Sequence, residues 1–396
     1  MAAPETIGDI KVIDVDTHVV EPYDLWTSRV STKKWGDKVP HVVWSEKRQE
    51  DIWLSGDRVL GAAGAPAQAG YQFPPPIYPP RLSDADPRTW RVQDRLQAMD
   101  DYGVHAQVLY PNVAGFGGGR FSDPKDAELN LQLIQAYNDW LTDYASAAPD
   151  RLIPVMGIPF WDIDLCIKEM ERCQANGHRG VIMSQEPEHY GQYKITDPHW
   201  DRLWAAAQEM GLPISFHIGS GDMSGWKMLA PSAGKVANYA AVSVTFNIAQ
   251  GRTVASLIAG GVCHRFPDLD FIMVESGVGW IPYLLQGMDW MWVESDVRSE
   301  HPEYDLLPSE YFKRQIYGCF WFESGPMLDA TIETIGPDNL LYETDFPHPT
   351  SMSPGPASSA VAAKDFIRDR LGHLDDGVLR KVLNENAVRV HGLGLG

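Results

Sequence analysis

The stretch VIDVDTHVV, residues 12–20, decides the fold and carries two residues that can bind a metal. Its apolar residues are nearly continuous, which is typical of a strand buried on both faces of a parallel sheet. Asp16 and His18 stand two positions apart near its end. Because side chains at i and i+2 of a strand lie on the same face, we expect the carboxylate and the imidazole to converge.

Seven further apolar runs follow along the chain, with helical periodicity between them. The runs cover residues 106–111, 152–158, 180–184, 213–218, 271–276, 315–322 and 339–345. Alternating strands and helices predict parallel pairing through right-handed crossovers. Eight such units can form an open sheet or a closed barrel. The one glycine cluster after a strand lacks the GxGxxG pattern of a dinucleotide-binding turn. The predicted fold class is therefore α/β, a (β/α)8 TIM barrel.

One long segment, residues 21–87, separates the first strand from the second. It contains four tryptophans and the proline-rich FPPPIYPP at residues 73–80. These tryptophans are Trp26, Trp35, Trp44 and Trp53. Such a segment is too apolar for a disordered linker. We expect residues 1–396 to form a single barrel domain, in which residues 21–87 are an insertion that acts as a lid or as a dimer contact.

The composition limits the partners of this chain. Its 53 acidic and 33 basic residues give a formal charge of −20, which argues against nucleic acid and anionic membranes as partners. The sequence shows neither a signal peptide nor an apolar run of the length that a bilayer requires. The four cysteines form no CxxC pair, as expected for free thiols. These features predict a cytoplasmic protein with a small-molecule substrate, and a homodimer is the commonest assembly.

Polar residues at the ends of the predicted strands are the candidates for chemistry, because TIM-barrel enzymes place their catalytic groups there. The fifth run ends near His217, the sixth near Glu275 and the eighth at Asp345, with His348 just beyond. A single histidine at a strand end usually has a structural role. Two imidazoles and two carboxylates at one barrel mouth instead indicate a divalent metal such as zinc, manganese or iron. The predicted ligands are Asp16, His18, His217 and Asp345.

Five motifs resemble the amidohydrolase-related branch of the amidohydrolase superfamily. They are DVDTHVVEPYDLW, SFHIG, FPDLDFIMVESGVGWIP, LLYETDFPH and KVLNENAVRVHG, and they extend the resemblance from about Asp14 to His391. That branch contains aminocarboxymuconate-semialdehyde and γ-resorcylate decarboxylases beside many hydrolases. The resemblance implies a TIM barrel with a metal site at its mouth. By position it carries the ligand roles onto Asp16, His18, His217 and Asp345.

Glu275 departs from the pattern of these decarboxylases, which have a histidine on the sixth strand. A glutamate there can act as a general acid or base if burial raises its pKa, can bind the metal, or can orient a ligand histidine. A second metal ion held by Glu21, Glu275 or His348 is also compatible with the sequence.

The leading hypothesis is hydrolysis of an amide, ester or thioester of a bulky or aromatic acyl group by a metal-activated water. Asp345 would hold the metal and accept the water proton, while Glu275 or His348 would protonate the leaving group. The alternative is nonoxidative decarboxylation of a hydroxybenzoate-like or unsaturated acid, in which a protein acid protonates carbon. A noncatalytic scaffold would have no need of the metal ligands.

Overall fold

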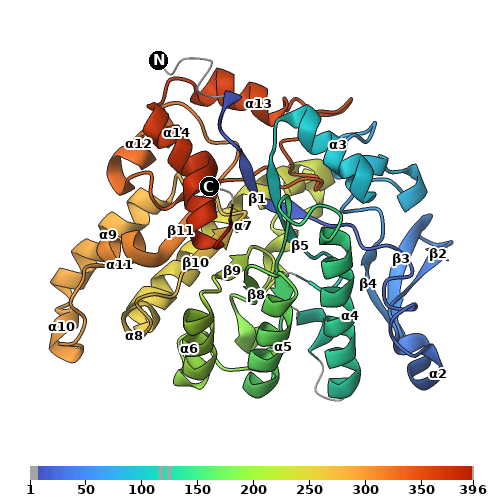
Figure 1. The fold of residues 1–396 in the computed structure, drawn as a ribbon, viewed down its shortest axis with the longest axis horizontal. Coiled ribbons are helices and arrows are strands. Elements are labelled where there is room, and N and C mark those ends of the chain that lie inside the picture. Colours follow the sequence, from blue (N-terminus) through green and yellow to red (C-terminus); the bar gives the residue numbers. More distant parts are fainter. Residues whose placement is uncertain (1–7, 116–118, 123–125, 395–396) are drawn as a thin grey trace.

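A ring of parallel strands forms the centre of the molecule in the computed structural model, which describes residues 8–115, 119–122 and 126–394 (Figure 1). Its strands, in chain order, are β1 (Ile13–His18), β5 (Ala106–Tyr110), β6 (Leu152–Pro154), β7 (Met156–Gly157), β8 (Val181–Met183), β9 (Ile214–His217), β10 (Phe271–Val274), β11 (Ile316–Phe320) and β12 (Leu340–Tyr342). All eight predicted runs contain one of these strands, and the third run contains both β6 and β7.

Hydrogen bonds close the strands into a ring. Each strand pairs in parallel with the next, in the order β1-β5-β6 and then β7-β8-β9-β10-β11-β12. Val155 joins β6 to β7, so these two short strands are one interrupted strand. At the seam, Asp345 N donates to Asp16 O at 2.9 Å, and His18 N donates to Phe346 O at 2.7 Å. Thr344 N donates to Asp14 Oδ1 at 2.8 Å across the same seam. The chain is therefore α/β with a closed parallel ring.

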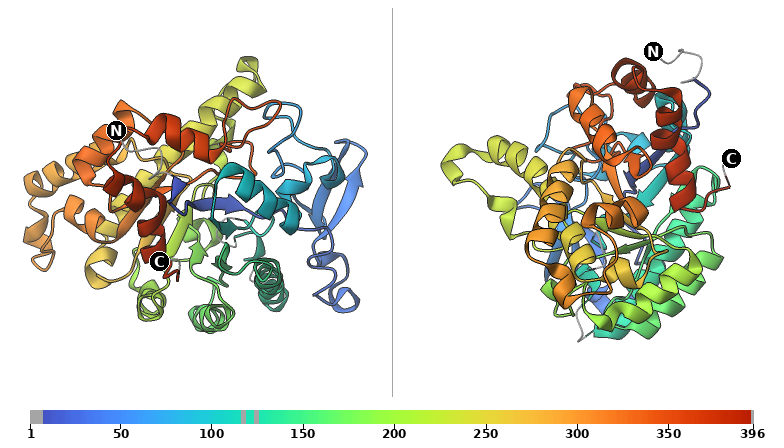
Figure 2. Two further views of the ribbon diagram at one scale, coloured as in Figure 1. Left: turned by 45° about the horizontal axis from the view of Figure 1, so that its top comes forward. Right: turned by 90° about the vertical axis from the view of Figure 1, so that its left-hand side faces the viewer.

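Helices separate the strands along the chain and cover the outside of the ring (Figure 1). They are α3 (Val92–Tyr102), α4 (Ala127–Ala145), α5 (Ile163–Ala175), α6 (Asp201–Met210), α7 (Lys235–Ala259), α8 (Val262–Arg265), α9 (Ile281–Glu294), α10 (Val297–Glu300), α11 (Pro308–Gln315) and α12 (Pro326–Ile335), followed by α13 (Ala363–Phe366), α14 (Asp376–Arg380) and α15 (Asn386–Val390). Two π-helical stretches, η10 (Ile367–Leu371) and η11 (Lys381–Glu385), lie within the last group. The first half of α7 projects from the body, as the right-hand view of Figure 2 shows.

The core has two layers that follow from the alternation of side chains along each strand. Ile13, Val108 and Ile272 belong to a cluster inside the ring, whereas Leu109 and Met273 pack in the layer between strands and helices. None of the helices in the described ranges combines the length and the apolar character needed to cross a bilayer.

The insertion between β1 and α3 forms its own antiparallel sheet, which lies to the right in Figure 1. Its elements are α2 (Thr32–Trp35), β2 (His41–Ser45), β3 (Glu50–Ser55) and β4 (Arg58–Ala62). The sequence predicted an ordered segment but not these strands. Trp26 is fully buried and donates from Nε1 to Leu133 O in α4 at 3.0 Å. Trp35 Nε1 donates to Gln132 Oε1 at 3.1 Å, so both tryptophans anchor the insertion to helix α4 of its own chain.

Candidate metal centre

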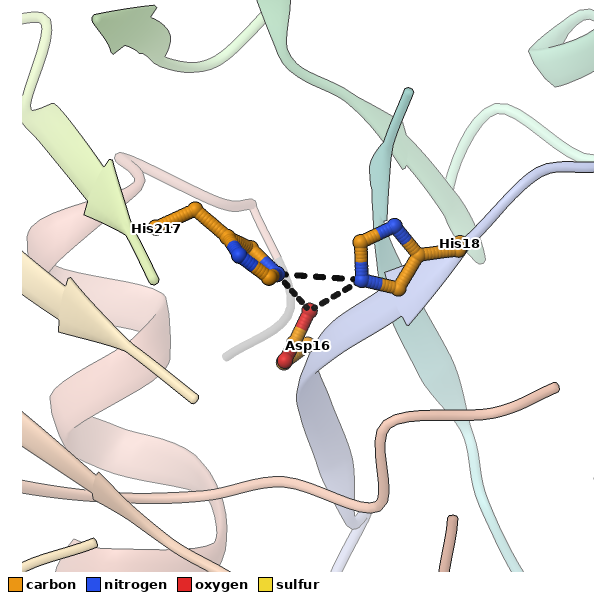
Figure 3. A group of neighbouring side chains, drawn as sticks. All are labelled: Asp16, His18 and His217. Atoms are coloured by element: carbon orange, nitrogen blue, oxygen red, sulfur yellow. Dashed lines mark hydrogen bonds and ion pairs between the residues drawn. The ribbon is translucent and has the colours of Figure 1, made fainter. Parts of the chain in front are cut away.

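Two strands bring three predicted ligands together at the mouth of the ring. Asp16 and His18 lie at the end of β1 and His217 at the end of β9, and Figure 3 shows their side chains pointing toward one another. The two Nε2 atoms are 3.0 Å apart. Asp16 Oδ1 lies 3.3 Å from His18 Nε2 and 3.6 Å from His217 Nε2. All three residues are fully buried, so bulk water does not reach them. We call these three, together with the neighbouring Glu275, Asp345 and His348, the metal group.

A register shift in β1 helps to aim these side chains. It falls between Asp14 and Thr17 in the pairing with β5. A bulge of this kind breaks strict alternation and redirects side chains. Val15 packs in the interior of the ring, and strict alternation would turn the next residue, Asp16, to the opposite face. Asp16 instead reaches the metal group.

Backbone carbonyls orient both imidazoles. His18 Nδ1 lies 3.1 Å from Pro111 O, and His217 Nδ1 lies 2.8 Å from Ile218 O. A carbonyl only accepts, so each Nδ1 carries the hydrogen and donates it. In a neutral imidazole this leaves the Nε2 lone pair directed at the other members of the group, which is the arrangement that metal-binding histidines use.

The charges of the group favour a bound cation. Both carboxylate oxygens of Asp16 are buried and accept no hydrogen bond from the described residues, and the same is true of Asp345 Oδ1. Burial would lower the pKa of His217, but the Asp16 carboxylate raises it to about 9. Burial would raise the pKa of Asp16, but the imidazoles of His217 and His18 hold it well below its usual range. Because buried carboxylates need positive charge or hydrogen-bond donors, the residues present fit a divalent metal ion.

Two acidic residues complete the group from β10 and β12. Glu275 directly follows β10, and Asp345 lies three residues after the end of β12. Oxygens of both join Asp16 in a cluster whose ligand atoms lie within 4.8 Å of one another. Both residues have a left-handed backbone, with φ of 54° and 57°. This conformation is rare for residues other than glycine and is concentrated at functional sites. Thr350 Oγ1 donates to Asp345 Oδ2 and lies 3.3 Å from Glu275 Oε1.

His348 closes the other side of the group. Its ring stacks on that of His18 at a centroid distance of 3.6 Å, and its Nδ1 lies 2.9 Å from Asp345 Oδ1. His348 Nε2 lies 2.6 Å from Asn112 Oδ1, while Asn112 Nδ2 donates to Val19 O. Asn112 Oδ1 therefore accepts, and His348 Nε2 is the donor. Burial lowers the pKa of His348 to about 3, so its imidazole is neutral at physiological pH.

Burial raises the pKa of the other acids of this site, Glu275, Glu343 and Asp345, well above their usual ranges. Burial, followed by the nearby Asp345 carboxylate, raises the pKa of Glu275 well above its ordinary value. Burial, followed by the charge of Asp16, does the same for Glu343, whose Oε2 accepts a hydrogen bond from Glu275 N at 3.1 Å. Several carboxylates so close together cannot all be charged, so at least one carries a proton.

All six predicted residues lie in this one group: Asp16, His18, His217, Glu275, Asp345 and His348. Glu21, the remaining candidate for a second metal, lies apart from the groups formed by described residues. Its Oε1 accepts from Asn112 N and Val113 N at 2.8 Å each, so it braces the loop that carries Asn112.

Sequence reasoning missed three neighbours of the group: Asn112, Glu343 and Thr350. Asn112 directly follows the second predicted run, and the strand-end rule applied there would have found it. Glu343 stands two positions before Asp345, at the spacing that already linked Asp16 to His18. Thr350 lies in a loop beyond the last strand, where periodicity gives no signal.

Two of the cavities formed by the described residues lie near the mouth, and of these two the smaller is lined by a member of the metal group, His348. The larger, about 690 Å³, lies between α7 and residues 185–196 and is lined by none of the six residues. The smaller, about 200 Å³, lies between residues 68–75 and 348–359 and is lined in part by His348. The smaller cavity is therefore the one adjacent to the site.

The sequence profile of the amidohydrolase family matches residues 13–393, which span the whole ring and the metal group. The chain belongs to the amidohydrolase family. Members of this family have a TIM barrel, in agreement with the closed parallel ring.

This chain is similar to another amidohydrolase and to several decarboxylases. The γ-resorcylate decarboxylase of Rhizobium radiobacter is 25% identical over 275 residues, which cover 65% of this chain and 77% of that protein. The crystal structure of an amidohydrolase from Mycobacterium avium subsp. paratuberculosis K-10 has a TM-score of 0.73 at 21% identity, with 97% of this chain and all of that chain covered. A 5-carboxyvanillate decarboxylase from Novosphingobium aromaticivorans, solved with bound manganese, has a TM-score of 0.67 at 17% identity, with 99% of both chains covered.

Proposed function

We propose that this amidohydrolase is a metal-dependent nonoxidative decarboxylase of a hydroxybenzoate-like acid. In the sequence analysis, hydrolysis is the leading hypothesis and nonoxidative decarboxylation is the alternative. Similarity to γ-resorcylate and 5-carboxyvanillate decarboxylases supports decarboxylation instead. The single observation that carries the proposed chemistry is a buried acid, Glu275, which stands where those decarboxylases have a histidine and lies 3.8 Å from His217 Nε2 at the edge of the metal group.

The metal ion would be held by Asp16, His18, His217 and Asp345. When bound, a divalent ion supplies Lewis-acid attraction for the substrate's carboxylate and an adjacent hydroxyl oxygen. The two carbonyls that accept from the imidazole Nδ1 atoms keep the Nε2 atoms directed at one another and at Asp16, where the ion would be held. His348 stacks on His18 and holds that ring in place.

Glu275 would be the acid that protonates the substrate. Burial, followed by the nearby Asp345 carboxylate, raises the pKa of its carboxyl well above that of an ordinary glutamate, which favours the protonated form that a proton donor needs. The proton goes to the ring carbon that bears the carboxylate, using an electron pair of the ring. The bond between that carbon and the carboxylate then breaks, its electron pair restores the aromatic ring, and carbon dioxide leaves. Glu275 regains a proton from solvent, so each turnover consumes one substrate carboxylate and one proton.

The insertion of residues 21–87 would act as a lid. Gln68 N and Ala69 N donate to Pro347 O at 3.0 Å each, which ties the insertion to the loop between Asp345 and His348. A covered site excludes water, which strengthens the electrostatic interactions inside it.

Carbon dioxide release by manganese- or zinc-loaded protein tests this function. The substrates to compare are 2,6-dihydroxybenzoate, 5-carboxyvanillate, and an ester and a thioester of benzoic acid. We expect carbon dioxide from at least one hydroxybenzoate, and a loss of release in Glu275→Gln with metal retained. Cleavage of the ester or thioester without carbon dioxide release from any acid would overturn the proposal.

A further inference from the structure

The first half of α7 and the loop before it, residues 222–249, project from the body of the molecule in the right-hand view of Figure 2. We call this segment the arm. Residues 222–237 are all exposed, and from residue 235 to residue 249 only Val242 and Asn247 are buried. Helices in proteins gain most of their stability from packing, and the arm has little packing within its own chain. The arm therefore offers a surface for a further contact.

The arm turns large apolar side chains toward solvent. Trp226, Val236, Val244 and Ile248 have exposed fractions of 44%, 66%, 51% and 55%. Exposed apolar side chains gathered on one segment usually mark a contact with another protein or with a membrane. The charges of the arm distinguish between these two kinds of partner.

The arm carries only positive charge beyond its first residue, although the chain as a whole is acidic. No Asp or Glu occurs from Met223 to Pro267, in a chain with 53 acidic residues and a formal charge of −20. Lys227 and Lys235 lie in the exposed part of the arm, and neither forms an ion pair with a described residue. The arm therefore presents apolar side chains and unpaired positive charges together, which fits a partner surface that is both apolar and acidic.

The end of α9 and the helix after it, α10, present a surface of this kind. Trp290 and Val293 are exposed by 62% and 65%. Residues 289–305 contain six acidic residues and one arginine. Glu294, Asp296 and Glu300 are exposed, and none of them forms an ion pair with a described residue. Apolar side chains and unpaired negative charges therefore lie together at this end of α9.

The two surfaces complement each other but do not pair within one chain. Helix α7 meets α9 at Gly251, where a Cβ would lie 3.5 Å from Trp280, and the arm ends before this contact. In a symmetric dimer, the arm of each copy can meet α9 and α10 of the other, so the same complementary contact forms twice. An anionic membrane fits less well, because the chain as a whole is negatively charged.

We propose that the arm of one copy docks on α9 and α10 of a second copy, with Lys227 and Lys235 facing the cluster of Glu294, Asp296 and Glu300. The exposed apolar side chains of both segments are then buried between the copies, and the lysines gain acidic partners. The contact does not involve the residues of the metal group, so the inference is independent of the proposed reaction.

Sedimentation equilibrium of the full chain gives its mass in solution and the dissociation constant of the dimer, and we expect a dimer. Lys227→Glu combined with Lys235→Glu replaces attraction by repulsion and should raise the dissociation constant by about tenfold or more. Glu294→Lys combined with Asp296→Lys should have the same effect from the other side. A variant with all four changes restores opposite charges across the contact. Its dissociation constant should return to within about threefold of the unmodified value.

Lys168→Glu combined with Lys364→Glu is the matched control. These exposed lysines lie on α5 and α13, and their replacement changes the net charge as much as the two changes in the arm do. The dissociation constant of the control should equal that of the unmodified protein. Circular dichroism shows which variants are folded.

A monomeric unmodified protein would overturn the inference whether or not any variant folds. A folded charge-reversed variant that dimerises as tightly as the control would also overturn it, as would a folded variant with all four changes that is no tighter than the two double variants. Binding of a monomeric protein to phosphatidylglycerol vesicles, lost when both lysines of the arm are reversed, would identify a lipid surface as the partner instead.

Discussion

Glu275 and Asp345 lie at the ends of two different strands, share a left-handed backbone conformation and are bridged by one hydroxyl. Thr350 Oγ1 donates to Asp345 Oδ2 and lies 3.3 Å from Glu275 Oε1. A hydroxyl has one hydrogen, so it cannot donate to two carboxylates at once. It can donate to Asp345 while accepting from a protonated Glu275. This arrangement agrees with the different roles proposed for the two acids, a metal ligand for Asp345 and a proton donor for Glu275.

Glu275→Gln should lower turnover by roughly 100-fold or more, because the amide has no acidic proton to transfer. The side chain keeps its size, so metal content should stay at the level of the unmodified protein. Steady-state rates and metal analysis on the same sample measure both effects. Nearly full turnover together with a lower melting temperature would mean that Glu275 only supports the fold.

Thr350→Val should lower turnover by about tenfold, because valine has the shape of threonine but no hydroxyl. Without the bridge, Asp345 loses one donor and Glu275 is less well oriented. We expect kcat to fall more than KM changes, since the substrate does not contact this hydroxyl in the proposed mechanism. Thr27→Val, at an exposed position of the insertion, is the matched control. Identical kinetics for both variants would contradict the bridging role.

His217→Ala should remove metal and activity together while the barrel remains folded. His217 contributes one imidazole to the group and donates to the Ile218 carbonyl next to it, so its loss opens the metal site without disturbing another strand. Metal stoichiometry and circular dichroism are the measurements. Stoichiometric metal in a folded His217→Ala protein would show that the ligands lie elsewhere.

Acidification should destabilise the protein through His391, which is buried far from the metal group at the end of the last helix. Burial lowers the pKa of His391 from 6.5 to about 4. As the pH falls, His391 in the unfolded chain therefore binds a proton near pH 6.5, whereas His391 in the folded protein binds it only near pH 4. The stability contribution of neutral His391 is full above pH 6.5 and is lost as the pH falls toward 4, with a slope of about 1.4 kcal/mol per pH unit.

His391→Asn removes the titrating group while keeping a side-chain donor for the Arg179 carbonyl. Denaturant unfolding between pH 7 and 4 should give a smaller decline for the variant than for the unmodified protein. Parallel stability curves would contradict this linkage.

The homodimer remains a prediction, and the structure suggests where to look for its interface. Large apolar side chains are exposed on α7 and α9, among them Ile248, Tyr283, Trp290 and Val293. Exposed apolar surface of this kind often marks a contact between proteins. Light scattering coupled to size exclusion should give the mass of a dimer. Trp290→Glu should then shift the mass toward that of a monomer, and a monomeric unmodified protein would contradict the prediction.

Much of the fold and the group of six could be predicted because both follow from local patterns. Buried strands read as apolar runs, and the strand-end rule selects His217, Glu275 and Asp345 independently of any long-range contact. The bulge in β1 was not predicted, since apolar alternation alone gives no sign of an extra residue.

The contacts that depend on the path of loops were not predictable in the same way. Gln68 and Ala69 contact Pro347, beside the site, because the insertion folds back across this loop, which no periodicity in residues 21–87 encodes. The hairpins of β2, β3 and β4 had a usable signal in the alternation around Trp44 and Trp53. The four tryptophans of residues 21–87 indicate a lid or a partner contact. Two of them, Trp26 and Trp35, donate hydrogen bonds to α4 of the same chain.

The seam between β1 and the segment after β12 has a consequence for how the protein is made. Asp16 and His18 emerge from the ribosome before the candidate ligand Asp345 and before Thr344, whose hydrogen bond to Asp14 spans 330 residues. A nascent chain that has not reached this segment has three of the four candidate ligands, Asp16, His18 and His217, and an open ring. Metal capture by the full set of candidate ligands therefore has to wait until residue 345 has been made, and a chain released before that residue would lack both the closed ring and the complete site.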